Sequence, residues 1–202
     1  MIEYNDVEFG MYDLDPWLAM KMERFGGPEP ERGQLELLKE KIRLYPPIPA
    51  KDMLPSWYTE DHVLRHCLGI KWVTSRGYLM RAPTDITIRN FMISEMAEGV
   101  MTQGFPFEDG ELPKVFKIDL PWMIRSKDKK PIDFLVTTPA YHLKSDVDIR
   151  IQQGILAGDK IPKGSPHGEE INPFFCSKTI ESETSLVFKE GDPIVQLIPV
   201  YK

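Results

Sequence analysis

Short apolar runs separated by turn residues fill the last two thirds of the chain, and this pattern constrains the fold most. The runs lie at residues 77–80, 86–88, 115–118, 134–136, 149–151, 185–188 and 194–198. Several of them alternate apolar and polar residues with a period of two, the spacing of a half-buried strand. Short strands with regular turns are typical of a sandwich or a barrel, so the sequence predicts a mainly β domain over residues 70–202.

The first 69 residues have a different pattern, which makes the expected fold α+β overall. Asp15 followed by Pro16 predicts a helix start, because a side-chain cap precedes a proline at the first helical position. A second helix is expected over 31–43, and a third from about residue 59 to Gly69. Prolines between residues 45 and 58 predict extended chain. We expect residues 1–69 to form a helical, proline-rich N-terminal extension packed on the β domain.

Composition and charge exclude several classes of protein. The chain has 202 residues, a formal net charge of −6 and no block of five like charges. A broad grip on nucleic-acid phosphates is therefore not expected. No apolar stretch is long enough to span a bilayer, and the acidic N-terminus lacks the features of a signal peptide. Without an export signal, Cys67 and Cys176 are expected to be free, buried thiols.

The chain carries no strong catalytic or metal-binding motif. His62 and His66 share a helix face by spacing, but valine follows His62 where a metalloprotease helix has glutamate. His167 begins a pattern of two iron ligands, yet no histidine follows it to complete the site. No phosphate-binding loop, dinucleotide fingerprint or serine elbow is present. We expect no bound metal and no cofactor.

The segment 188–199 gives the most specific pattern. It predicts a strand, a tight turn in which Gly191 supplies the conformation, and a second strand that begins near Pro193. Gln196 lies within the apolar second strand, so its amide is expected to bond to backbone or to a partner chain. A further turn, of the hairpin type, is expected over 126–130.

The Gly-Asp-x-Ile-x-Gln-Leu pattern of this segment resembles the final strand of the trimeric dUTPase and dCTP deaminase fold. The resemblance implies a β-clip, a compact barrel-like domain, over residues 77–202. It also implies a nucleotide site that gathers Arg81 for phosphate, Asp85 for Mg²⁺, His142 for proton transfer, and Asp159. Ala157 stands where that family has its catalytic aspartate, and a methyl group cannot accept a proton. The resemblance therefore does not favour dUTPase activity.

A second resemblance covers residues 45–202. Ile48-Pro49-Ala50-Lys51, Leu120-Pro121-Trp122-Met123-Ile124 and the Gly-Asp-Pro-Ile-Val-Gln-Leu-Ile-Pro ending are similar to a protein family of tailed bacteriophages and cyanophages to which no activity is assigned. The resemblance implies a viral origin. It places the protein in the host cytoplasm during infection, with the virion as a further location.

Two functions follow as expectations. The first is a non-enzymatic virion or assembly component that contacts other phage proteins or copies of itself as a trimer, with Trp57, Tyr58 and Gln196 at the interface. A host protein is an alternative partner for such a chain. The second is a nucleotide-binding or nucleotide-hydrolysing regulator that uses the degenerate site and Mg²⁺. The absence of the catalytic aspartate favours the first.

Overall fold

The computed structural model describes residues 1–25, 32–55, 58, 66–89, 95–97, 100–105, 114–127, 132–139, 149–151, 154–157, 169–171, 173–177 and 184–201. Strands dominate these residues, and every pairing between them is antiparallel. The helices are α1 (Leu14–Phe25), α2 (Arg32–Leu44) and α3 (Leu68–Ser75), with a short 3-10 turn at Ala50–Asp52. The protein is therefore mixed α and β with strands in the majority, as the sequence predicted.

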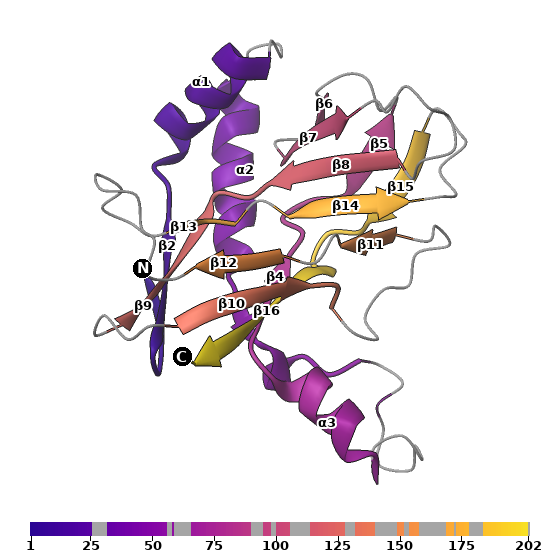
Figure 1. Ribbon diagram of the computed structural model, residues 1–202. Helices are drawn as coiled ribbons and strands as arrows, with labels where there is room; N and C mark the ends of the chain where they lie inside the picture. Colours follow the sequence, from indigo (N-terminus) through magenta and orange to yellow (C-terminus); the bar gives the residue numbers. More distant parts are fainter. Residues whose placement is uncertain are drawn as a thin grey trace.

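Four antiparallel groups of strands make up the β framework (Figure 1). One sheet has the order β12 (Gly154–Ala157), β10 (Ile132–Thr137), β16 (Pro193–Tyr201), β4 (Tyr78–Arg81), β3 (Ile48–Pro49). A second has β11 (Ile149–Ile151), β14 (Phe174–Ser177), β8 (Lys114–Asp119), β7 (Val100–Phe105), β6 (Glu95–Ala97). A third has the order β1 (Ile2–Tyr4), β2 (Val7–Met11), β9 (Trp122–Ser126), β13 (Glu169–Glu170). The fourth group has two strands, β15 (Thr184–Phe188) and β5 (Ile86–Arg89).

The strand β16 is the central strand of the first sheet, although it comes last in the chain. This strand of nine residues pairs with β10 through residues 196–201 and with β4 through residues 193–197. Six consecutive residues, Pro193–Ile198, are buried, so both faces of this strand are covered. A strand buried on both faces has a continuous apolar run rather than an alternating one, which is the pattern of Pro-Ile-Val-Gln-Leu-Ile.

The N-terminal residues are integral to the main core. Phe9 of β2 and Tyr78 of β4 pack edge to face, with ring centroids 5.2 Å apart. Trp17 of α1 and Ile42 of α2 belong to the same buried cluster as Phe134 of β10. Helices α1 and α2 thus lie against the strands (Figure 1), and each contributes an apolar stripe to the core.

All seven predicted apolar runs form strands, and the first two predicted helices are present with shifted ends. The turn expected at 126–130 does not join a hairpin, because β9 pairs with β2 and β13 whereas β10 pairs with β12 and β16. The expectation that Gly69 ends a helix is also wrong, since Gly69 lies inside α3. Residues 59–65, where that helix was expected to start, lie outside the described part of the chain.

Candidate functional site

Arg81 lies at the end of β4, where two neighbouring residues hold its guanidinium. Its Nη2 donates a hydrogen bond of 3.1 Å to the carbonyl oxygen of Pro46. Its guanidinium carbon lies 5.3 Å from the ring centroid of Tyr45, a cation–π contact. Burial lowers the pKa of Arg81 below its ordinary value. This cation therefore fastens the segment that follows α2 to the sheet.

Asp85 and Glu190 are in contact at the turn formed by residues 189–192. The backbone amide of Glu190 donates to Oδ1 of Asp85 at 2.8 Å. The carboxylate of Glu190 accepts one hydrogen bond from Nζ of Lys41 at 2.8 Å and another from the hydroxyl of Tyr45 at 2.9 Å. These two bonds lower the pKa of Glu190, and the bond to Glu190 raises the pKa of Tyr45.

Gly191 lets the turn approach Tyr45 closely. Its φ of +84° belongs to the left-handed region, which glycine adopts without steric cost. A Cβ at this position would lie 3.1 Å from Cε1 of Tyr45. The backbone of the turn is bonded to Ala82 in both directions, from Gly191 N to Ala82 O and from Ala82 N to Asp192 O, each at 2.8 Å. We call the group Lys41, Tyr45, Arg81, Asp85 and Glu190 the clasp.

The clasp brings together two of the four residues predicted for a nucleotide site. Arg81 and Asp85 both contact the region of the 189–192 turn, Arg81 through Tyr45 and Asp85 through the Glu190 amide. Each takes part in contacts within the chain that hold distant segments together. His142 and Asp159 lie outside the described residues. Sequence reasoning missed Lys41, Tyr45 and Glu190, because they come from segments far from residue 81.

Gln196 bonds to backbone, one of the two outcomes expected for it. Its Nε2 donates to the carbonyl oxygens of Val73 at 2.7 Å and of Arg76 at 2.8 Å. These carbonyls belong to the C-terminal end of α3, where helix geometry leaves carbonyl oxygens without intrahelical partners. Gln196 is 1% exposed, so the side chain anchors α3 from within the sheet.

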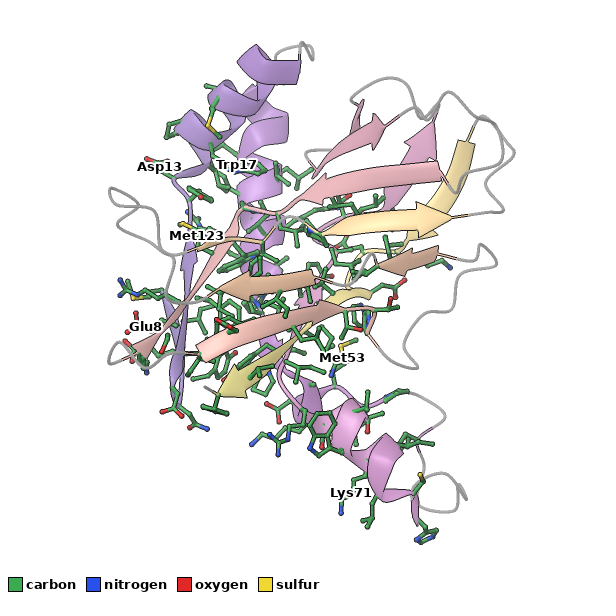
Figure 2. The ribbon with its side chains drawn as sticks, viewed as in Figure 1. Glu8, Asp13, Trp17, Met53, Lys71 and Met123 are labelled. Carbon is green, nitrogen blue, oxygen red and sulfur yellow. The ribbon has the colours of Figure 1, made fainter. Side chains whose placement is uncertain are left out.

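The helix α3 projects from the lower end of the first sheet (Figure 1), and it presents apolar side chains to solvent. Leu68 is 82% exposed and Trp72 is 48% exposed. The guanidinium carbon of Arg76 lies 5.0 Å from the ring centroid of Trp72. Lys71 points away from the strands (Figure 2). Leu68 and Trp72 are spaced by four, so they lie on one side of the helix, and Arg76, which follows the last helical residue, lies beside Trp72. We call these three residues the α3 stripe.

The spacing of the α3 stripe is present in the sequence, but it was not predicted as helical because Gly69 suggested a helix end. Two other predicted residues belong to the neighbouring segment. Tyr58 is half-buried, and its backbone amide donates to Pro55 O at 2.9 Å, whereas Trp57 lies outside the described residues. The prediction that Cys67 is buried is wrong, because this free thiol is exposed at the start of α3.

Within the described ranges, no group of three or more His, Cys, Asp and Glu side chains is placed to hold a metal ion. His66 is exposed, and its predicted partner His62 is outside those ranges. Among the helices that the structure describes, none is both long and apolar enough to cross a bilayer.

A scan against protein-family models finds no match, and a search of curated proteins finds no significant match. The candidate site therefore stands on geometry alone.

Proposed function

We propose that this protein is a non-enzymatic bacteriophage protein that serves as a virion structural or assembly component and acts through protein–protein contacts. The observation that carries the proposal is the α3 stripe. It places Leu68, Trp72 and Arg76 in solvent on a helix anchored by Gln196. Exposed large apolar side chains on a fixed element are typical of interaction surfaces, and Trp and Arg dominate the energetics of such surfaces.

The phage setting of the proposal rests on the sequence resemblance over residues 45–202. Its fold assignment, a β-clip of the dUTPase type with a tendency to form trimers, rests on the pattern through Gln196. The central position of β16 supports that assignment, because the motif strand is the one on which the first sheet is built. The proposed locations are the host cytoplasm during infection and the assembled particle.

Mass spectrometry of purified particles and assembly intermediates tests the proposal. The phage that encodes the chain is grown, its particles are banded by density, and capsid precursors are isolated from the infected cells. We expect the chain in one of these fractions at a constant ratio to a known structural protein. Its absence from both fractions, while it is abundant in the lysate, contradicts the proposal.

The competing function is a nucleotide-binding regulator with Mg²⁺, and one observation favours it. Arg81, at the end of β4, and Asp85, just before β5, both lie near the 189–192 turn, and they are the cation and the carboxylate that a phosphate and a metal would need. Thermal-shift measurements with nucleoside triphosphates and Mg²⁺ distinguish the two functions. A ligand at about 100 times its Kd stabilises by about 2.7 kcal/mol, which is readily measured. We expect no shift, and a shift that Asp85→Asn removes supports the regulator instead.

A further inference from the structure

The segment of the chain that contains α3 is basic in an otherwise acidic protein, and Asp52 is the carboxylate of the 3-10 turn that contacts α3. Residues 62–84 contain no aspartate or glutamate, and their basic residues are Arg65, Lys71, Arg76 and Arg81, in a chain with a formal net charge of −6. Arg81 is held in the clasp. Lys71 and Arg76 are exposed beside the apolar side chains of the α3 stripe. The surface thus combines apolar area with positive charge.

The helix that carries the α3 stripe is fixed to the rest of the protein. The Gln196 amide bonds the carbonyls of Val73 and Arg76, and Ala50 N donates to Gly77 O at 2.9 Å just beyond the helix. The contact between Arg76 and Trp72 orients the indole ring before any partner arrives. Because the Trp72 ring is already oriented by Arg76, binding loses less conformational entropy than at a flexible surface.

We infer that the α3 stripe docks into an apolar pocket rimmed by carboxylates on another protein of the same phage; this inference rests on the proposed function. Leu68 and Trp72 would fill the pocket, while Arg76 and Lys71 would pair with the rim. Charge complementarity selects this partner, because opposite charges at the rim of an interface steer and orient association. A symmetric pair of α3 stripes would instead bring Arg76 and Lys71 against the same cations of a second copy.

Nucleic acid fits the surface less well than an acidic protein. A protein that binds phosphates without sequence preference neutralises on the order of six to ten of them. The exposed side of α3 offers two basic side chains, Lys71 and Arg76, beside a large apolar area. The apolar area would remain in water on a phosphate backbone, whereas a protein pocket would bury it.

Site-specific photo-crosslinking identifies the partner. The photoreactive residue p-benzoylphenylalanine replaces Lys71 in the full chain during infection, and the matched control places it at Leu37. Leu37 is 54% exposed on α2, so both positions are open to solvent. We expect a cross-link at position 71 to another phage protein, with a carboxylate-rich segment at the linked site, and none to that protein at position 37.

Titration of this protein with the purified partner then measures how much the α3 stripe contributes to the affinity. We expect Trp72→Ala to weaken the Kd by tenfold or more and Leu37→Ala to leave it unchanged. Arg76→Glu should also weaken binding, and replacing a rim carboxylate of the partner by lysine should restore part of it. We expect each variant to fold, because all three side chains are exposed. Thermal melts check this.

Several results would overturn the inference. These are no cross-link at position 71, an equal cross-link at position 37, a cross-link to nucleic acid, lipid or a second copy, or a Trp72→Ala variant that binds like the wild type. The wild-type chain and its Trp72→Ala variant could both be present in particles in equal amounts. That result would keep the proposed function but show that the α3 stripe is not the surface that carries it. Absence of the wild-type chain from particles and precursors removes the proposed function itself.

Discussion

Gln196 of β16 donates two hydrogen bonds from its side-chain amide to the C-terminal end of α3, at the carbonyl oxygens of Val73 and Arg76. One buried side chain in the centre of a sheet therefore fixes the orientation of a projecting helix. The contact explains why an amide occupies a strand whose neighbours are apolar. Leucine would fill the space but would leave two carbonyl oxygens without these donors.

Replacement of Gln196 tests the anchoring of α3. We expect Gln196→Leu to lower the free energy of unfolding by about 1–3 kcal/mol, because buried acceptors lose their donors. Gln196→Glu should cost more, since a carboxylate has no donor and is costly to bury. Urea unfolding measures both. Val200→Ala, at a partly exposed position of the same strand, serves as the control and should change stability by less than about 0.5 kcal/mol.

Gly77 ends α3 in a conformation that only glycine accepts easily. Its φ is +74°, and a Cβ there would lie 2.0 Å from the carbonyl oxygen of Leu197. We expect Gly77→Ala to lower stability by more than about 3 kcal/mol or to prevent folding, because backbone atoms would have to move. Gly154→Ala is the matched control, since its Cβ would meet no atom within 4 Å. Equal stability of the two variants would contradict the close approach of residues 77 and 197.

Adjacent leucines of α2 should differ sharply in their effect. Leu38 is 4% exposed and belongs to the main core, whereas Leu37 is 54% exposed. We expect Leu38→Ala to cost about 2–5 kcal/mol, because it leaves a cavity, and Leu37→Ala to cost less than about 0.5 kcal/mol. Denaturant midpoints compare the two directly. A small loss for Leu38→Ala would mean that α2 is not docked on the core.

The clasp should weaken in acid. Its hydrogen bonds from Lys41 and Tyr45 lower the pKa of Glu190 below 4.5, so the folded state favours the charged carboxylate. The stabilisation is therefore present above pH 4.5 and is lost as the pH falls through the folded pKa. We expect Glu190→Gln to be less stable than wild type at pH 7 and the two to converge as the pH falls through the folded pKa of Glu190. Urea midpoints across this pH range measure the difference, and parallel curves would contradict it.

The alternating runs predicted strands correctly because their pattern directly reflects one buried and one exposed face. The strand β9 was not predicted; its residues Trp122, Met123 and Ile124 are all buried, so its run does not alternate. The helix α3 was missed because Gly69 suggested a helix end, whereas Gly69 lies inside α3.

The candidate site was only partly predictable, because its contacts join distant segments. The sequence singled out Arg81 and Asp85, but Tyr45 and Glu190 are 145 residues apart and meet only in the folded chain. Asp85 and Glu190 are separated by 105 residues. Pattern and spacing carry no information on such pairs. Gln196 was singled out because an amide in an apolar strand needs a partner, and α3 supplies it.

The central position of β16 has a consequence for biosynthesis. A ribosome makes residues 193–201 after every other element that the structure describes, yet β4 and β10 can join only through this strand. One edge of β10 and one edge of β4 therefore stay unpaired until residues 193–201 have been made. During that interval the nascent chain exposes strand edges that can pair with other chains. Its yield in a cell should depend on chaperones that shield such edges.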